Sequence, residues 1–391
     1  MTPTPALRLV LSAGEASGDL LGADLARALK LQRPDIELAG VTGPRMRAAG
    51  VETWFDIDEL SVMGLSEVIR HLPRLVRLRR ALKARTLAWP AAAMVSIDAP
   101  DFHFGLDRQL KAQGLPAIHY VSPSVWAWRA GRIGKIARSV DMLLTLFPFE
   151  PPLYQAAGLK AQFVGHPLAD ELQAGPDKTG ARAALGLDCS GPVIALLPGS
   201  RDGELARHLS LLEETARLLH QRLPHAQILL LLTGPRHQRM AAERLSGTSS
   251  SLPIHLLGDQ TRLGLQAADV ALAASGTVTL EAFLLECPLV VFYRLAPTTY
   301  HLARSLRLVR SEHVSLPNVL CQRSLVPERL QQAATPGQLL EDTLGWLNAP
   351  DRIKAYRQLA GDWRGQLALN AGTQAAKAIL SQLGTRVDSD A

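Results

Sequence analysis

"LRLVLSAGEASGDLLGADLARALK" (residues 7–30) decides the fold class. An apolar run at residues 7–13 predicts a strand, the glycine-containing stretch "GEASGD" (residues 14–19) predicts a turn, and residues 20 to 30 or so predict a helix. Strand, turn and helix in this order form the opening unit of a doubly wound parallel sheet. We therefore expect an α/β fold whose ligands bind beyond the carboxyl ends of the strands.

The same alternation restarts in the second half of the chain. The first series of strands ends at "AQFVGHPLAD" (residues 161–170), a polar and alanine-rich stretch follows to about residue 190, and "PVIALLPGS" (residues 192–200) begins a second series. This pattern predicts two Rossmann-like lobes with a cleft between them. We expect a first lobe over residues 1–170, a second over residues 171–345, and a helical tail over residues 346–391.

Composition narrows the class of protein. The chain has 391 residues, of which 47% are hydrophobic, so it can bury two cores and is not a disordered chain. It contains no apolar run of membrane-spanning length, and its N-terminus does not read as a signal peptide, so we expect a cytoplasmic protein. Its three cysteines lie far apart and match neither a disulfide framework nor a zinc site. The net charge of +6 favours anionic partners without choosing among nucleic acid, acidic lipid and phosphorylated metabolite.

Two turns of the second lobe have the chemistry of phosphate-binding turns. In "LLPGSRDGE" (residues 196–204), Gly199 and Ser200 offer N–H groups and a hydroxyl, and Arg201 offers a bidentate cation. In "ASGTVTLEAF" (residues 274–283), a strand ends and a helix opens at three small residues, namely Ser275, Gly276 and Thr277. A helix N-terminus favours phosphate, although serine and threonine also cap helices that bind nothing.

Glu281 follows the second of these turns by one helical turn, where a carboxylate accepts hydrogen bonds from the hydroxyls of a ribose. Two anion-binding turns and this acid together predict a site for a nucleoside diphosphate. The chain has neither G-x-x-x-x-G-K-[ST] nor G-x-G-x-x-G, so P-loop chemistry and a nicotinamide oxidoreductase are both disfavoured.

Carboxylates mark the strand ends of the first lobe. In "IDAPDF" (residues 97–102), Asp98 follows a buried strand directly and is placed to act as a general base, whereas Asp101 suits a helix cap better. In "GEASGD", Glu15 is a candidate to orient a substrate hydroxyl and Asp19 a candidate helix cap. For His166, in "GHP", we expect a structural role.

A basic stretch without acidic residues runs from residue 70 to residue 85, with apolar residues at helical spacing among its cations. It resembles an interfacial helix that lies on a membrane surface. A helix packed on the sheet with a basic outer face is an equally good interpretation. An RNA-binding face ranks third, because no aromatic stacking motif accompanies it.

Together, ten segments of the chain resemble the lipid-A-disaccharide synthase family, in the same order and from about residue 9 to residue 331. These are "SAGEASGDLLGA", "VMGLSEV", "IDAPDF", "YVSPSVWAW", "FPFEP", "VGHPLAD", "LLPGSRDGE", "ASGTVTLEAF", "LPNVL" and "PERLQ". Val278 and Arg294 depart from the family's more usual alanine and lysine, and neither change removes a chemical group that the resemblance requires.

The resemblance implies a two-lobed glycosyltransferase of the GT-B type. It implies transfer of 2,3-diacylglucosamine from UDP to the 6-hydroxyl of 2,3-diacylglucosamine 1-phosphate, with inversion at the anomeric carbon and release of UDP. The implied catalytic residues are Asp98, Glu15 and Arg201, with Asp98 as the base or as part of the group that activates the acceptor. UDP would be held by Gly199, Ser200, Arg201, Ser275, Gly276, Thr277 and Glu281, the rest of the substrates would be contacted by Ser17, Asn318 and Gln331, and no metal or other cofactor is expected.

Acylated substrates also give the basic stretch a function. The resemblance implies that the region of residues 63–82 meets the anionic inner face of the inner membrane and receives acyl chains, through Met63, Ile69, Leu72, Arg74, Leu75, Val76, Arg77 and Arg80. We expect peripheral membrane association and no nucleic-acid partner, and a homodimer is compatible with this interpretation. Competing interpretations are an epimerase or a peptidoglycan-type transferase on the same fold, and a basic nucleic-acid-binding protein.

Overall fold

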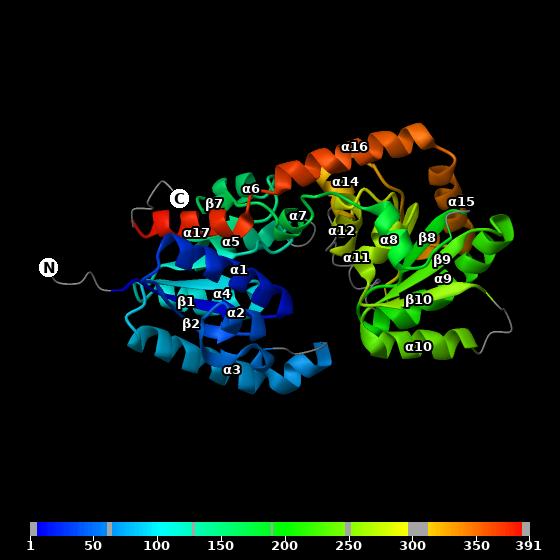
Figure 1. The fold of residues 1–391 in the computed structure, drawn as a ribbon. Helices are drawn as coiled ribbons and strands as arrows, with labels where there is room; N and C mark the ends of the chain where they lie inside the picture. Colours follow the sequence, from blue (N-terminus) through cyan, green and yellow to red (C-terminus); the bar gives the residue numbers. More distant parts are fainter. Residues whose placement is uncertain are drawn as a thin grey trace. The chain divides into compact units, whose positions relative to one another are not determined.

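The computed structural model describes residues 6–60, 65–126, 130–188, 191–246, 252–295 and 312–384, with the backbone alone for residues 65–72 and 130. The chain forms two compact units (Figure 1). One comprises residues 1–171 together with 366–391, and the other comprises residues 172–365. Both are α/β units built on a parallel sheet, which confirms the predicted fold class.

The first unit has seven parallel strands in the order β3-β2-β1-β4-β5-β6-β7. The strands are β1 (Arg8–Ala13), β2 (Glu37–Thr42), β3 (Glu52–Asp56), β4 (Ala93–Ile97), β5 (Ala117–Tyr120), β6 (Met142–Thr145) and β7 (Lys160–Phe163). Its helices are α1 (Ala16–Gln32), α2 (Pro44–Ala48), α3 (Leu65–Ala88), α4 (Pro100–Lys111), α5 (Ile133–Ser139), α6 (Pro151–Gln155), α7 (Pro167–Glu171) and α17 (Ala371–Gln382).

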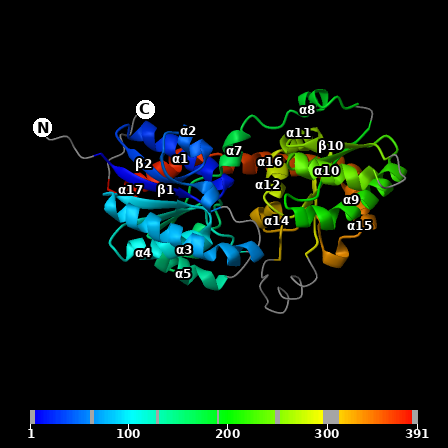
Figure 2. The same cartoon turned by 90° about the horizontal axis from the view of Figure 1, so that it is seen from below.

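Side chains of the central strands alternate between two cores. In β1, Leu9 and Leu11 face a core shared with α1 and α17, whereas Val10 faces a core shared with α3 and α4. Figures 1 and 2 show α1 beside α17, and α3 beside α4. Because both faces of the sheet are covered, its central strands are mostly apolar, as in the sequence pattern that predicted them.

The second unit has six parallel strands in the order β10-β9-β8-β11-β12-β13. The strands are β8 (Val193–Leu197), β9 (Gln227–Leu232), β10 (Ile254–Gly258), β11 (Val270–Ala274), β12 (Leu289–Tyr293) and β13 (Glu328–Leu330). Its helices are α8 (Lys178–Ala184), α9 (Asp202–Arg222), α10 (Gly234–Ser246), α11 (Thr261–Ala267), α12 (Val278–Leu284), α14 (Leu316–Cys321), α15 (Pro336–Leu347) and α16 (Pro350–Leu367).

The C-terminal tail divides between the units instead of forming a separate segment. Trp346 and Tyr356 are fully buried in the second unit, where the Trp346 indole donates to the Leu289 carbonyl (2.8 Å) and the Tyr356 hydroxyl to the Cys287 carbonyl (3.0 Å). The chain then returns to the first unit, where α17 packs on α1. These buried anchors explain why a predicted tail of residues 346–391 is not one structural piece.

In each sheet the strand order reverses once, between β1 and β4 and between β8 and β11. In open α/β sheets, ligands bind at the carboxyl ends of the strands beside such a switch point. The turns that follow these four strands are therefore the first places to look for a site. Among the described helices, none is long and apolar enough to cross a membrane.

Candidate active site

The switch point of the first sheet joins Ser17 and Asp98, which are 81 residues apart in the sequence. Ser17 lies in the first turn of α1, after β1, and Asp98 follows β4. Because β1 and β4 are neighbours, the Ser17 hydroxyl donates to Asp98 Oδ2 at 3.1 Å. The Asp98 side chain is partly exposed, so its carboxylate is accessible to a ligand as well as bound to Ser17.

Asp98 and Ala99 form a strained turn. Both have left-handed backbone conformations, with φ of 57° and 45°, which L-residues other than glycine rarely adopt. Besides the Ser17 bond, several hydrogen bonds hold the turn. The Asp98 N–H donates to the Tyr120 carbonyl (3.0 Å), the Ala99 N–H to Asp98 Oδ1 (2.8 Å), and the His103 ring to the Asp98 carbonyl (2.7 Å), while the N–H groups of Phe102 and His103 donate to the Ala99 carbonyl (3.0 and 3.1 Å). Strain of this kind persists only where surrounding contacts fix it, and it is common at active sites.

Gly14 allows the two turns to approach each other. A Cβ atom at Gly14 would lie 2.1 Å from the Cβ of Ala99, far inside van der Waals contact. The glycine predicted only as part of a turn is therefore needed for the close packing of the β1–α1 turn against the β4–α4 turn. This close approach brings Ser17 within reach of Asp98.

The neighbouring acids have distinct surroundings. Glu15 is the exposed N-cap residue of α1, and its side chain makes no capping bond. Asp19 is buried and accepts the N–H groups of Gly43, Arg45 and Met46, so it caps the start of α2 and not its own helix. Asp101 is exposed and paired with Arg132 at 3.0 Å.

A buried polar cluster beneath the Asp98 turn was missed from the sequence. His103 Nε2 lies 2.8 Å from the Ser12 hydroxyl, and the Ser96 hydroxyl lies 2.8 Å from Asp107 Oδ2 and 3.1 Å from His119 Nδ1. Burial lowers the pKa values of His103 and His119 to about 4 and raises that of Asp107 to about 7. In the sequence, the only indication of this cluster was the presence of polar residues such as Ser12, Ser96 and His119 inside otherwise apolar strands.

His166 is buried, and its Nδ1 accepts the Leu168 N–H at 3.2 Å, in agreement with the structural role expected for it. Burial lowers its pKa to about 4. The unfolded chain binds a proton at this residue below its ordinary pKa of 6.5, whereas the folded chain does not until about pH 4. The stabilisation from this neutral ring is therefore complete above pH 6.5 and is lost as the pH falls toward 4.

We expect His166→Asn, which keeps a hydrogen-bond acceptor, to remove this dependence. Between pH 7.5 and pH 5 the free energy of unfolding of the wild type should fall by about 2 kcal/mol relative to the variant. Denaturant unfolding of both proteins at the two pH values measures the difference. A constant difference would show that His166 is not buried in its neutral form.

In the second unit, the turn after β8 is organised around Glu204, which sequence reasoning did not select. Arg201 is the N-cap residue of α9, and its side chain is 80% exposed. The buried Glu204 carboxylate accepts from the N–H groups of Ser200 (3.2 Å) and Arg201 (3.4 Å), from Arg201 Nη1 (3.0 Å) and from the Tyr293 hydroxyl (2.9 Å). The signal was a glutamate three residues after the N-cap, the spacing of a capping box.

This arrangement changes how the turn can bind an anion. The amides of Ser200 and Arg201 already have Glu204 as an acceptor, so they are not free donors in this conformation. The exposed Arg201 guanidinium is the stronger anion-binding group of the turn. Gly199 has a φ of 108°, and a Cβ there would lie 2.5 Å from Glu204 Oε2, so glycine is required beside this carboxylate.

The turn after β11 carries Ser275, Gly276 and Thr277. Gly276 and Thr277 are exposed, whereas the Ser275 hydroxyl donates to the Val314 carbonyl at 3.1 Å. Glu281 accepts from Arg262 Nε at 3.3 Å, so one of its oxygens has a cationic partner within the unit. The β8 and β11 turns are neighbours because the two strands pair.

Asn318 and Gln331 differ in accessibility. Asn318 is 1% exposed, its amide NH2 donates to the Val326 carbonyl (3.0 Å) and to Glu328 (2.8 Å), and its oxygen accepts the Val326 N–H (2.8 Å). The predicted substrate contact is thus fully engaged inside the unit, where it fixes the segment after α14. Gln331 is partly exposed at the carboxyl end of β13, in a left-handed conformation with φ of 54°.

The predicted membrane-facing residues lie on or before α3. Met63 falls outside the described residues, as do the side chains of Ile69 and Leu72. Farther along, Leu75 packs partly against the core of the first unit, beside the buried Leu78 and Leu82, so this part of α3 is a helix packed on the sheet. Val76 is half-buried, and the cations of this segment, Arg74, Arg77 and Arg80, are exposed.

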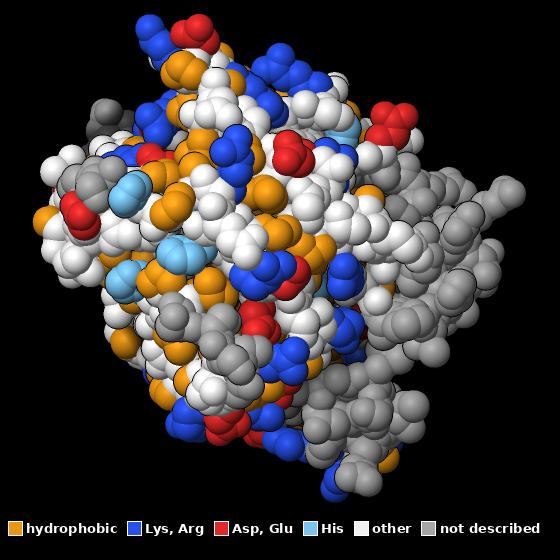
Figure 3. All heavy atoms as spheres, turned by 90° about the vertical axis from the view of Figure 1, so that its right-hand side faces the viewer, with side chains coloured by type: hydrophobic (Ala, Val, Ile, Leu, Met, Phe, Trp, Pro, Cys, Tyr) orange, Lys and Arg blue, Asp and Glu red, His pale blue; other side chains and the backbone are white. Residues whose placement is uncertain are grey.

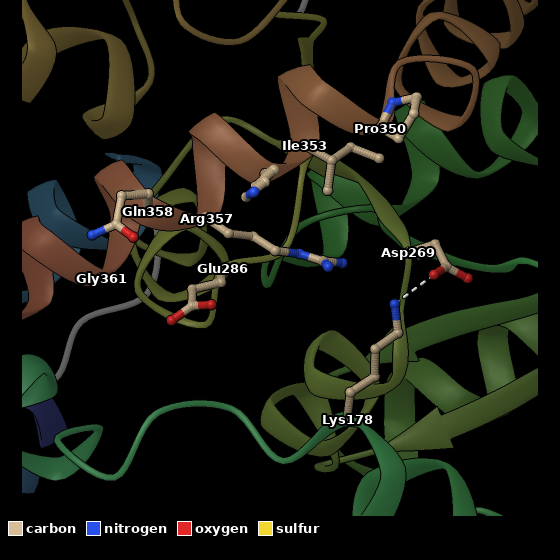
Figure 4. Close-up of a pocket in the computed structure, with 9 residues that line it drawn as sticks. Lys178, Asp269, Glu286, Pro350, Ile353, Arg357, Gln358 and Gly361 are labelled. Carbon is tan, nitrogen blue, oxygen red and sulfur yellow. Dashed lines mark hydrogen bonds and ion pairs between the residues drawn. The ribbon is translucent and has the colours of Figure 1, made fainter.

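A hollow of about 570 Å³ lies elsewhere in the second unit, beneath α16 (Figure 4). It is near the amino ends of β11 and β12, the edge of the sheet opposite to the candidate turns. Its acids are paired, Asp269 with Lys178 and Arg182 and Glu286 with Arg364. These ion pairs link α8 and α16 to the sheet, so the hollow is not the nucleotide site that the sequence predicted.

Within the part of the chain that the structure describes, no three His, Cys, Asp or Glu side chains are grouped to hold a metal ion. Figure 3 looks onto the end of the second unit, where Lys and Arg side chains are scattered among acidic and apolar ones. The described side chains on this face therefore form no continuous basic stripe of the kind that nucleic-acid-binding surfaces carry.

Comparison with known proteins assigns the family. A family model described as lipid-A-disaccharide synthetase matches residues 9–381. A lipid-A-disaccharide synthase of Xanthomonas campestris pv. campestris (strain 8004) is 46% identical over 382 residues, which are 97% of this chain and 87% of the relative. One of Xylella fastidiosa (strain 9a5c) is 45% identical over 97% of this chain and 99% of its own.

Solved structures show the fold. A putative UDP-N-acetylglucosamine 2-epimerase from Listeria monocytogenes matches with a TM-score of 0.67 and 14% identity, over 99% of this chain and 100% of its own. The calicheamicin glycosyltransferase CalG4 matches with a TM-score of 0.57 and 17% identity, over 98% and 100%. The architecture is therefore that of GT-B glycosyltransferases and related epimerases. The chain belongs to the lipid-A-disaccharide synthetase family, and it is a UDP-sugar glycosyltransferase that makes the lipid A disaccharide.

Proposed function

We propose that the chain transfers 2,3-diacylglucosamine from UDP to the 6-hydroxyl of 2,3-diacylglucosamine 1-phosphate with inversion, giving a β-1′,6-linked disaccharide 1-phosphate and UDP. The observation that carries this proposal is the Ser17–Asp98 pair at the switch point of the first sheet. A partly exposed carboxylate, fixed by a strained turn at a ligand-binding edge, has the placement that a general base requires.

Asp98 has free lone pairs with which to accept the proton of the acceptor hydroxyl. Its two oxygens accept one hydrogen bond each, from Ala99 N–H and from Ser17. A carboxylate has about four acceptor positions, so it retains capacity to accept the 6-hydroxyl of the acceptor sugar. As the O–C1 bond forms, the proton passes to Asp98 and the bond from C1 to the UDP oxygen breaks. Glu15, exposed beside Ser17, orients the same sugar.

The departing UDP carries the developing negative charge. Arg201 is the cation assigned to it, because its side chain is exposed and the Glu204 carboxylate orients its guanidinium through a 3.0 Å bond to Nη1. The exposed Gly276 and Thr277 complete the phosphate site from the neighbouring strand, with Gly199, Ser200 and Ser275 shaping the two turns. Glu281 is assigned to the ribose, and Gln331 to the sugar.

An assay of both products in EDTA tests this function against an epimerase. With the UDP-linked donor and the 1-phosphate acceptor present, we expect equal amounts of disaccharide and UDP, because Arg201 replaces a metal in stabilising the leaving group. Donor consumption without the acceptor would indicate an epimerase or a hydrolase. A requirement for added Mg²⁺ would contradict the metal-free part of the proposal.

We further propose that the protein works in the cytoplasm, attached peripherally to the anionic inner face of the membrane through α3, and that it binds no nucleic acid. The cations Arg74, Arg77 and Arg80 are exposed and three residues apart, so they lie near one another along the helix. Each basic residue near an anionic bilayer contributes about 1 kcal/mol. A homodimer is part of the same proposal, and the molar mass of the protein in solution tests it.

Charge reversal on α3 should weaken vesicle binding. We expect the triple change Arg74→Glu, Arg77→Glu and Arg80→Glu to abolish flotation with anionic vesicles at low salt. The matched control reverses three exposed cations of the second unit, namely Arg222, Arg239 and Lys354, which changes the net charge equally. Equal flotation of the two variants would show that α3 is not the attachment surface.

A further inference from the structure

His103 occupies a position between the first strand and the turn that carries Asp98. It lies in the first turn of α4, is fully buried, and makes one hydrogen bond from each ring nitrogen. Nδ1 is 2.7 Å from the Asp98 carbonyl oxygen, and Nε2 is 2.8 Å from the hydroxyl of Ser12 in β1. The ring therefore joins the two strands that flank the switch point.

These partners determine the tautomer. A carbonyl oxygen only accepts, so Nδ1 must carry the hydrogen and donate it to Asp98. In the neutral ring Nε2 is then an acceptor, and the Ser12 hydroxyl donates to it. Burial opposes a charged ring, and the pKa of His103 is lowered to about 4, with Asp107 of α4, His119 of β5 and Arg79 of α3 as the charged or titratable groups around it.

We propose that His103 is a positioning residue for the reaction: it holds the Asp98 carbonyl, and with it the left-handed turn that directs the Asp98 carboxylate toward the acceptor sugar. This inference rests on the proposed role of Asp98 as the base. Two consecutive left-handed residues are unfavourable without support. The His103 ring is the side chain that holds the Asp98 carbonyl, whereas the Ser17 hydroxyl holds the Asp98 carboxylate and backbone N–H groups hold the Ala99 carbonyl.

A similar histidine-to-turn hydrogen bond in the second unit supports a positioning role for His103. His208 of α9 is buried, and its Nδ1 lies 2.6 Å from the Pro198 carbonyl, at the start of the turn that leads to Arg201. Its Nε2 accepts the Arg294 N–H at 3.1 Å, at the end of β12. In both units, a buried histidine on the helix after the switch-point strand bonds the carbonyl of the strand-end turn.

Three substitutions at His103 separate positioning from packing. Asn places an amide N–H near the position of Nδ1, Gln places its amide nearer Nε2, and Ala removes both bonds. We expect His103→Ala and His103→Gln to lower kcat about 10–100-fold with KM for both substrates nearly unchanged, as when geometry at the reacting atoms is disturbed. We expect His103→Asn to recover most of the lost activity.

A double-mutant cycle with Asp98→Asn gives the decisive comparison. If His103 acts through Asp98, His103→Ala should have little further effect on kcat in the Asp98→Asn background. A multiplicative loss there would overturn the proposal, as would normal kcat in a folded His103→Ala or His103→Gln variant, or failure of Asn to recover activity. Full activity of Asp98→Asn alone would instead refute the proposed base.

Ser12→Ala provides a second test of the proposal, which remains possible if His103→Ala does not fold. It removes the donor to Nε2 and leaves the ring in place, so the Asp98 carbonyl still sets the tautomer but the ring loses its second anchor. We expect a loss in kcat smaller than that of His103→Gln, again absent in the Asp98→Asn background. Thermal unfolding of each variant establishes that the rates refer to folded protein, and a full additive loss in the double variant would contradict the proposal.

Discussion

Asp98→Asn is expected to lower kcat by about 10²–10⁴-fold, the usual contribution of a general base. The amide has the shape of the carboxylate, so it preserves packing in the strained turn, but it does not take the proton of the 6-hydroxyl. Because binding groups remain, KM for both substrates should change little. Steady-state kinetics with the UDP-linked donor and the 1-phosphate acceptor measure the effect.

Asp101→Asn is the matched control for this prediction. Asp101 lies three residues away on α4, its side chain is 84% exposed, and its carboxylate pairs with Arg132 at 3.0 Å. Since an exposed pair of this kind contributes little to stability, the control should retain normal kcat. Near-normal turnover in Asp98→Asn would remove Asp98 from the base role.

Arg201→Ala is expected to lower kcat/KM for the UDP-sugar by about 10²–10³-fold, the usual cost of removing one group that stabilises a developing anion. Lysine at this position should recover only part, because it does not form the bidentate pair with phosphate oxygens that arginine forms. The inhibition constant of UDP should rise in parallel. Arg239→Ala, at an exposed arginine of the same unit, provides the control.

Glu204 contributes to the expected effect of Arg201→Ala. Removal of the guanidinium leaves the buried Glu204 carboxylate without its cationic partner, next to the proposed phosphates. Part of the loss should therefore come from repulsion, and Glu204→Gln added to Arg201→Ala should recover some UDP affinity. Full activity of the Arg201→Ala variant would show that Arg201 does not stabilise the UDP phosphates.

The sequence predicted the sheets well because strands covered on both faces are nearly continuous apolar runs. It also placed Ser17 and Asp98 at strand ends, but their contact depends on β1 and β4 being neighbours, and strand order is a property of the whole sheet. The division of the C-terminal tail followed from buried partners such as the Leu289 carbonyl for Trp346, which no local pattern reveals.

Side-chain accessibility was the least predictable property. Asn318 has the chemistry of a substrate contact, yet its amide NH2 already donates to Val326 and Glu328, which lie eight and ten residues later. Conversely, His103 and Glu204 were overlooked because their function lies in bonds to backbone turns, and a histidine or glutamate on a helix is ordinary in sequence. The roles of both residues follow from hydrogen bonds that only the folded structure shows.

The stereochemistry of the product is the most direct test of the account. Starting from a donor with an α-linked UDP, a single displacement assisted by Asp98 forms a β-1′,6 linkage. The coupling between the protons on C1′ and C2′ of the isolated disaccharide, measured by NMR, distinguishes the two anomers. A β-linked product is predicted, whereas an α-linked product would contradict both the single displacement and the assignment of Asp98 as its base.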